Sequence, residues 1–417
     1  MNVLIKSATI IDPSGPFNKK TQDILIENGI IKKIDNSIKN SEGYNEIKLD
    51  SLHISPGWFD TSVSFGEPGF EERETIENGL NTAAKSGFTA VAINPNTYPM
   101  VDNKSAIEFI KNKGIDSATS LFPIGSLTKN AESKDLAELY DMQNSGAIAF
   151  GDYCKPVSNA NLLKIALQYA QNFDALVFSY PQDDSIAGIG LVNENVNSTK
   201  LGLKGMPSMA EEMQIARDLF LLEYTGGKLH IPTISTANSV KLIEEAKKKG
   251  LNVTCSVTAH HLILTDDELV NFDSNTKVLP PLRTKKDTKA LIKGVEKGVI
   301  DIITSDHNPI DIEHKKVEYN NAKFGTIGLE SLFGALNKTI SLEKLISCLS
   351  ENPKSRFNID CPPIKEGEKA SLTLFNPDFE YVFTKDCISS TSKNAIFLNK
   401  KMKGKVYGII SNNKKVL

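Results

Sequence analysis

Residues 228–259 read KLHIPTISTANSVKLIEEAKKKGLNVTCSVTA, and this stretch decides the fold. An apolar run, KLHIPTIST (228–236), precedes the helix-like segment SVKLIEEAKKKG (239–250), and a second apolar run, LNVTCSVTA (251–259), follows it. The middle segment ends in lysines and then glycine, which suits the C-terminus of a helix. The stretch therefore predicts a strand, a helix and a strand, the unit that builds parallel sheets.

The same alternation extends outward in both directions. One strand begins near Trp58, and further apolar runs that predict strands lie at 88–94, 118–125, 146–151, 175–181 and 298–306. Eight strand and helix units over about 300 residues favour a TIM barrel with insertions. A doubly wound dinucleotide-binding sheet would carry G-x-G-x-x-G after its first strand, and the sequence has no such motif there.

A second helix is predicted over 208–226. Ser208 and Glu211 have the spacing of a capping box, and Gly226 and Gly227 supply a stop. We expect this helix to begin with Ser208 as its N-cap.

The residue pattern at both ends of the chain predicts short strands. VLIKSATII and DILIENGIIKKID lie near the N-terminus, with Asn28-Gly29 at a hairpin turn position. The C-terminal part contains SLTLFNP and VYGIISNNKKVL. We predict an α/β protein: a (β/α)8 TIM barrel at 56–364 with a small β-sandwich domain built from both termini, residues 1–55 and 365–417.

Composition excludes several classes of function. The 48 Lys and Arg against 51 Asp and Glu give a net charge of -3, so no basic excess points to nucleic acid or anionic lipid. The five cysteines form no C-x-x-C pair and indicate reduced thiols. There is no signal-peptide pattern and no apolar run of the roughly 20 residues that cross a bilayer. We expect a cytoplasmic protein without nucleic-acid or membrane partners.

Several segments together are similar to bacterial dihydroorotases of the amidohydrolase superfamily, in register and nearly end to end. They are PGWFDTSVSFGEPGFEERETIENGLNTAAKSGFTAVAINPNTYPMVDN (56–103), GAIAFGDYCKPV (146–157), VNENVNSTKLGLKGMPSMAEE (192–212), VTAHHLILTDDEL (257–269), PPLR (280–283), IDIITSDHNP (300–309) and FGTIGLES (324–331). The resemblance implies two divalent metals, usually zinc, at the C-terminal mouth of the barrel. These metals activate the water that opens the dihydroorotate ring.

The metal-ligand positions implied by the resemblance carry other residues here. Ser62 and Ser64 stand where the family has His-x-His, and Tyr180 and Thr233 replace two further histidines. Asp152-Tyr153 stands where the family has two adjacent aspartates. The sequence does not decide to which of these two aspartates Asp152 corresponds. The remnant carboxylates are therefore Asp152 and Asp306, and Asp306 alone clearly survives as a catalytic-site residue.

The substrate-binding positions are also changed. Gly66 stands at the family's carboxylate-binding arginine, Leu279 at an asparagine and Ile310 at a histidine, so only Asn96 remains of that set. Hydroxyl groups are weak neutral donors, whereas zinc is held by imidazole, thiolate and carboxylate. Without a metal, water keeps a pKa of about 15.7. We therefore expect no catalytic residues, no bound metal and no cofactor.

Other sites were weighed against ordinary structural roles. His230, His260, His261 and His307 could line the barrel, but we interpret them as packed histidines. A Cys255 nucleophile with His260 or His261 is disfavoured, because residues five apart along a strand face opposite sides. The run Lys247-Lys248-Lys249 is interpreted as a solvated helix terminus.

Function follows from the resemblance. Our leading hypothesis is a non-catalytic structural or regulatory partner of aspartate carbamoyltransferase in pyrimidine biosynthesis, because the resemblance includes such inactive subunits. The alternative is an active dihydroorotase or related cyclic-amide hydrolase with zinc in an atypical site around Asp152, Asp306 and His307. A third hypothesis is a sensor whose pocket, floored by Asn96, Tyr180 and Asp306, binds a pyrimidine precursor. The family also implies a homo-oligomer, at least a dimer.

Overall fold

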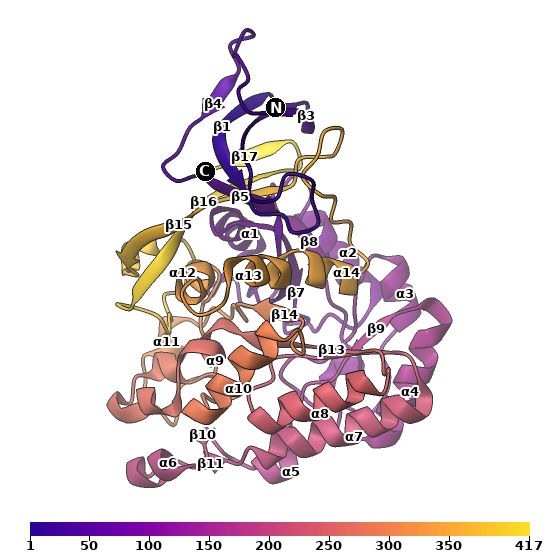
Figure 1. Cartoon of the computed structure of the whole chain (residues 1–417). Coiled ribbons are helices and arrows are strands. Elements are labelled where there is room, and N and C mark those ends of the chain that lie inside the picture. The colour runs from indigo at the N-terminus through magenta and orange to yellow at the C-terminus, as the bar shows by residue number, and fades with distance from the viewer.

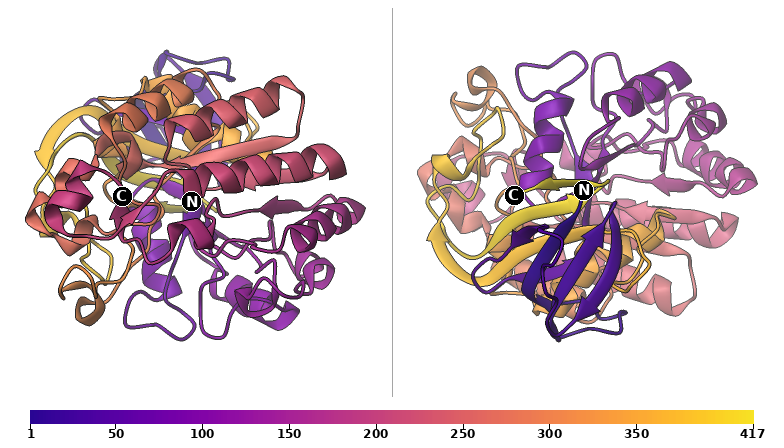
Figure 2. Two further views of the ribbon diagram at one scale, coloured as in Figure 1. Left: turned by 90° about the horizontal axis from the view of Figure 1, so that it is seen from below. Right: turned by 90° about the horizontal axis from the view of Figure 1, so that it is seen from above.

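The computed structural model describes residues 1–417 and contains a closed barrel of parallel strands (Figures 1 and 2). One sheet has the order β6-β7-β8 and another the order β14-β13-β12-β9. Their bounds are β6 (Trp58–Val63), β7 (Phe88–Ile93), β8 (Ser120–Pro123), β9 (Leu176–Phe178), β12 (Lys228–Ile231), β13 (Val253–Thr258) and β14 (Ile302–Thr304). Isolated bridges between Val63 and His307 and on both sides of Phe150 close the ring.

The fourth barrel strand is shorter than predicted. The segment 146–151 pairs only at Phe150, which bridges Gly125 on one side and Val177 on the other. Gly146 has a φ of 110°, a conformation outside the strand region, so the segment cannot extend as a regular strand from its first residue.

Helices cover the outside of the barrel and include the two that the sequence predicts, at 208–226 and 239–250. They are α1 (Ile76–Lys85), α2 (Lys104–Lys113), α3 (Leu139–Asn144), α4 (Ala160–Ala170), α7 (Met209–Thr225), α8 (Ala237–Lys248), α10 (Lys285–Glu296), α12 (Leu332–Leu336) and α13 (Leu342–Leu349). No helix is both long and apolar enough to span a membrane.

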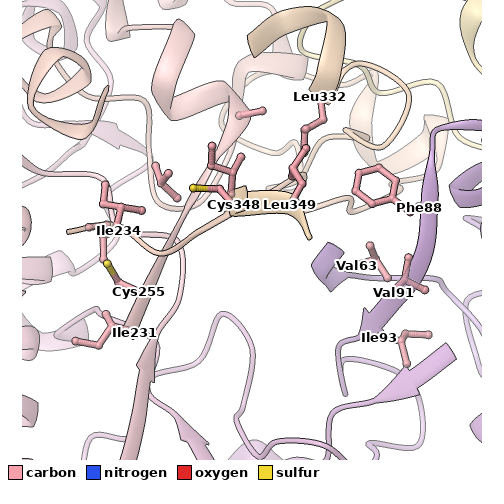
Figure 3. Close-up of a cluster of buried hydrophobic side chains, with 14 of the residues drawn as sticks. Val63, Phe88, Val91, Ile93, Ile231, Ile234, Cys255, Leu332, Cys348 and Leu349 are labelled. Carbon is pink, nitrogen blue, oxygen red and sulfur yellow. The ribbon is translucent and has the colours of Figure 1, made fainter. Parts of the chain in front are cut away.

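Side-chain alternation along the strands separates two cores. On β7, Val91 and Ile93 belong to the large cluster between strands and helices, part of which Figure 3 shows, together with Leu349 of α13. Ala90 and Ala92 point the other way, into a smaller cluster inside the barrel. This two-residue period is the physical basis of the strand predictions.

The two ends of the chain share one sheet, which confirms the predicted domain built from both termini (Figure 1). β5 (His53–Pro56) pairs with β1 (Val3–Ile10) on one side and with β15 (Leu372–Val382) on the other. The remaining strands are β2 (Thr21–Glu27), β3 (Ile30–Asp35), β4 (Asn45–Ile47), β16 (Lys401–Ser411) and β17 (Lys414–Val416). The predicted hairpin joins β2 to β3, with Asn28 and Gly29 both at positive φ.

The capping box predicted for the helix at 208–226 does not form. Ser208 already has helical φ and ψ, and its side chain makes no capping hydrogen bond. The Glu211 carboxylate instead accepts hydrogen bonds from the Ser235 and Thr236 amides at 2.9 and 3.1 Å. Glu211 therefore ties α7 to the start of α8, a long-range role that sequence spacing does not reveal. The helix ends as predicted, at Gly226 with a φ of 71°.

Candidate functional site

The predicted site residues converge at the C-terminal ends of the barrel strands. Ser62 is the last residue but one of β6, and the residues that follow the other strands complete the mouth, which is where TIM barrels carry their sites. The lining of the cavity there is Ser62, Asn94, Pro95, Ile124, Gly151, Asp152, Tyr153, Cys154, Phe178, Tyr180, Pro232 and Thr233.

Asp306 is the centre of a hydrogen-bond cluster in this mouth. The Ser62 hydroxyl donates to Asp306 Oδ1 at 3.0 Å, and the Tyr153 hydroxyl donates to the same atom at 3.1 Å. Burial raises the pKa of Asp306 to about 7, although these two hydrogen bonds favour its charged form. Neutral hydroxyls, rather than cations, therefore surround the surviving carboxyl.

Amide and hydroxyl groups continue the cluster across β6 and β7. Asn94 donates to the Ser62 hydroxyl at 3.1 Å and to the Ser64 hydroxyl at 3.3 Å. Ser64 in turn donates to Asn96 Oδ1 at 3.0 Å. The remnant Asn96 is thus joined to the serines that stand at the metal-ligand positions.

Asp152 and Tyr153 face different ways. The Asp152 carboxylate accepts hydrogen bonds from the Ser126 hydroxyl at 2.7 Å, the Thr128 hydroxyl at 2.6 Å and two backbone amides of the same loop. The Asp152 oxygens thus accept hydrogen bonds from the 126–128 loop, whereas the Tyr153 hydroxyl donates to Asp306. Tyr153, named from sequence only as a replaced aspartate, is therefore the residue of the pair that faces the centre of the mouth.

Two tyrosines fill most of the space at this end of the barrel. Tyr153 and Tyr180 follow two neighbouring strands of the barrel and line the cavity. The free volume left there is about 20 Å³, room for roughly one water molecule. The buried Tyr180 hydroxyl has no hydrogen-bond partner in the protein, and burial raises its pKa well above the usual value. A pocket for a small ligand is normally about 300 Å³ or more.

The donor set does not fit the pair of zinc ions that the resemblance implies. No group of three or more His, Cys, Asp or Glu side chains is placed so that it could hold a metal ion. At the mouth itself, the ligand positions carry hydroxyl groups and a single carboxyl, whereas zinc sites in proteins use imidazole, thiolate and carboxylate.

The backbone of the mouth keeps unusual conformations at three of its residues. Tyr153, Thr233 and Asp306 have φ values of 56°, 48° and 47°. Positive φ is costly for residues other than glycine, above all for β-branched threonine, and such positions concentrate at functional sites.

The positions that the resemblance assigns to substrate binding, apart from Asn96, are Gly66, Leu279 and Ile310. A Cβ atom on Gly66 would lie 1.8 Å from the Phe70 carbonyl oxygen, so no side chain, and no arginine, fits without moving the 66–70 turn. Ile310 is buried, and Leu279 packs against a small apolar cluster. No charged group remains among these positions to bind a carboxylate.

The histidines near the barrel have structural partners. His230 contacts Thr254 and Ser256 with its two ring nitrogens at 2.9 and 3.2 Å, and burial lowers its pKa well below the usual value. His261 contacts Thr258 at 2.7 Å, and burial lowers its pKa to about 4. These two are packed core histidines, as interpreted from sequence.

Two histidines keep one free nitrogen. His307 accepts a hydrogen bond from the Gly328 amide at 3.2 Å through Nδ1, while Nε2 has no partner. His260 Nε2 is also buried without a partner. Each stands without the second and third ligands that a metal site needs.

Two further interpretations are resolved by side-chain contacts. The Cys255 thiol lies 3.6 Å from the Val299 carbonyl oxygen, and burial raises its pKa, so it lacks the features of a nucleophile. The interpretation of Lys247-Lys248-Lys249 as a solvated helix terminus is wrong for Lys247. Its ammonium lies 2.6 Å from an Asp301 carboxylate oxygen and 2.8 Å from the Val299 carbonyl oxygen. Asp301 follows the turn after α10, so Lys247 links two barrel units.

The barrel, the site at its C-terminal mouth and the sheet made from both termini define a TIM-barrel protein with a β domain built from both ends of the chain. An L-hydantoinase (dihydropyrimidinase) from Arthrobacter aurescens has a similar structure, with a TM-score of 0.85 at 21% identity over 100% of this chain and 97% of that chain. A D-hydantoinase gives 0.82 at 20% identity, over 99% and 94%. At these identities the likeness shows the fold.

Sequence relatives narrow the class to a family. A dihydroorotase of Thermoanaerobacter sp. (strain X514) is 40% identical over 97% of this chain and 95% of its own length. A dihydroorotase of Pelotomaculum thermopropionicum is 38% identical over 100% and 99%. The family model described as Dihydro-orotase-like matches residues 52–239. The chain belongs to the dihydroorotase family.

Proposed function

We propose that this chain is a non-catalytic member of its family and acts as a structural or regulatory partner of aspartate carbamoyltransferase in pyrimidine biosynthesis. The observation that carries the first half is the filled mouth. Ser62, Tyr153 and Tyr180 occupy the place where the family's chemistry requires metal ligands and space for a substrate, and about 20 Å³ remains.

The chemistry of ring opening supports this proposal. Hydrolysis of a cyclic amide needs a strong nucleophile and a group that polarises the carbonyl, and a metal pair supplies both. Here the donor set does not fit such a pair, and the one central carboxyl, Asp306, already accepts two hydroxyl hydrogen bonds. No lysine or arginine lines this cavity to stabilise a developing oxyanion.

The same geometry weighs against the other two hypotheses. An atypical metal site would need the Asp152 carboxylate, which is saturated by the 126–128 loop. A sensor for a pyrimidine precursor would need room for a six-membered ring, and the cavity that Tyr180 lines is far smaller. Asn96 and Asp306, the other two residues of that hypothesis, do not line this cavity.

Metal content and turnover of the purified protein test the loss of catalysis. We expect well under one zinc per chain by elemental analysis and dihydroorotate turnover at the level of a buffer blank, with and without added zinc. The Thermoanaerobacter dihydroorotase, assayed in parallel, is the positive control. Two zinc ions per chain with turnover above the blank would overturn this half of the proposal.

The partnership is tested by assembly. The intact barrel frame around a non-catalytic mouth supports a role that depends on shape rather than chemistry. We expect the chain to co-purify with aspartate carbamoyltransferase from the same organism and to change the size of the transferase assembly in light scattering. A transferase whose size and activity are the same with and without this chain would remove the partnership.

A further inference from the structure

A second cavity lies at the other end of the barrel, between the N-terminal ends of the strands and the sheet built from both termini. Its walls include Thr89 near the start of β7, Ser120 and Phe122 of β8, and residues 28–30 and 411–413 at two hairpins of that sheet. Its volume is about 940 Å³, and sites for small molecules measure roughly 300 to 1,000 Å³. Unlike the mouth, this cavity has room for a small organic molecule.

Lys354 is the buried cation of this cavity. It lies on α14 (Glu351–Arg356), on the side of the barrel that faces the sheet built from both termini (Figure 1), and it is 3% exposed. Its backbone amide donates to the Ser350 carbonyl at 3.2 Å, and its carbonyl accepts from the Ile359 amide at 2.8 Å. The ammonium is therefore the polar group of Lys354 that is left to face the cavity.

The other two buried lysines have acceptors within the chain. The Lys277 ammonium donates to two backbone carbonyls at 2.8 and 3.0 Å, and the Lys315 ammonium donates to three at 2.7 to 3.1 Å. The Lys354 ammonium makes no hydrogen bond and no ion pair within the chain. A buried ammonium is costly unless it is paired, so Lys354 needs an acceptor that the chain itself does not provide.

The titratable groups near Lys354 do not neutralise it. Asp360 and Glu368 line the same cavity, but Asp360 is exposed and Glu368 pairs with Lys365 at 3.2 Å. The Cys361 thiol acts on Lys354, but burial raises the pKa of this thiol, so it stays protonated at neutral pH. Burial also lowers the pKa of Lys354, as expected for a cation that has no anion beside it.

We propose that this cavity binds a small organic anion, whose carboxylate or phosphate group pairs with the Lys354 ammonium. Lysine is a compact point charge that suits either group. Phe122 and Ile359 line the cavity and are only partly buried, so they supply an apolar wall for the body of the ligand. Ser371 and Ser411 also line it, and hydroxyl groups donate to oxyanions. Because the cavity and the mouth lie at opposite ends of the barrel, the inference is independent of the proposed function.

Calorimetric titration of the full chain with benzoate and with phenyl phosphate, at constant ionic strength, tests the site. We expect at least one of these anions to bind, and the tighter one identifies the head group. Lys354→Met keeps the length and the apolar stem of the side chain and should weaken binding at least about tenfold. Lys369→Met is the matched control, because this exposed lysine lines the same cavity, and it should change binding by less than about twofold. Benzamide, which has the shape of benzoate without its charge, should bind at least about tenfold more weakly than the better anion.

The melting temperature of Lys354→Met provides a second measurement, which needs no ligand. In chloride buffer this variant should melt at least about 1 °C above wild type, because it removes a buried charge that lacks a partner. The better anion should raise the melting temperature of wild type and leave that of the variant unchanged. The proposal is overturned if neither anion binds, if Lys354→Met binds the anion as tightly as wild type, or if benzamide binds as tightly as the anions. It is also overturned if Lys354→Met melts below wild type, since the ammonium would then have a partner within the chain.

Discussion

At the scale of single residues, the mouth of the barrel is a neutral hydrogen-bond cluster built around one buried acid. Asp306 has Ser62 and Tyr153 as its donors, and burial holds its pKa at about 7. A carboxyl bound to divalent cations would instead have a strongly lowered pKa. The protonation of Asp306 therefore reports on the state of the site.

Asp306→Asn should become relatively more stable as the pH rises. The folded-state pKa of about 7 exceeds the unfolded value of about 3.9, so the unfolded chain releases this proton first. In the wild type, the free energy of unfolding that depends on the Asp306 proton is fully present near pH 4, and it is lost as the pH rises through 7. Between these limits we expect the variant to gain up to about 4 kcal/mol over wild type.

Urea unfolding across that pH range measures this gain, and Asp386→Asn, at an exposed position, is the control for the loss of one carboxyl group. If Asp306→Asn lowered the free energy of unfolding at every pH, the result would indicate that the Asp306 carboxylate binds a cation in its charged form.

Ser62→His/Ser64→His should not recover dihydroorotate turnover. Tyr180 and Thr233 still lack imidazole groups, and Gly66 cannot carry the missing arginine because of the Phe70 carbonyl oxygen. We expect turnover at the blank level in the presence of zinc, measured beside an active dihydroorotase. Turnover clearly above the blank in the double variant would contradict the assignment of these positions.

At the scale of secondary-structure elements, polar side chains connect neighbouring barrel units. Glu211 on α7 holds the loop before α8 through the Ser235 and Thr236 amides and accepts from the Ser239 hydroxyl at 2.6 Å. The buried Arg283 guanidinium lies 3.9 Å from the same carboxylate. The network orders the loop that follows β12, which also carries Thr233.

Glu211→Ala should destabilise the fold by about 3 kcal/mol, because it leaves the Ser235 and Thr236 amides without their acceptor and removes the negative charge beside the buried Arg283 guanidinium. Thermal and urea unfolding measure the loss. Glu212→Ala is the matched control, since this neighbour makes one hydrogen bond at the surface, and it should cost less than about 0.5 kcal/mol. Equal losses in the two variants would show that the network is dispensable.

At the scale of the whole molecule, the chain has the barrel and the terminal sheet of its family, with a cluster of neutral hydroxyl groups around Asp306 in the mouth. The eight-stranded sheet joins both termini, and the barrel closes between Val63 and His307. Buried apolar contacts between strands and helices, rather than groups in the mouth, provide the stability of this frame.

Chelation should therefore leave the protein's stability unchanged. A structural metal adds stability in proportion to its binding, so its removal would lower the melting temperature. We expect dialysis against EDTA to shift the melting temperature by less than about 1 °C, since a change of 1 kcal/mol shifts it by only a few degrees. A fall of several degrees, reversed by zinc, would reveal a metal that the barrel depends on.

The sequence by itself determined the barrel, the shared terminal domain and the absence of imidazole at Ser62, Ser64, Tyr180 and Thr233, because strand periodicity and residue identity are local properties. Only the tertiary structure decided which way Asp152 and Tyr153 face, that Glu211 serves α8 rather than its own helix, and that the mouth is filled. These features depend on which side chains from distant segments meet, and spacing along the chain does not specify those contacts.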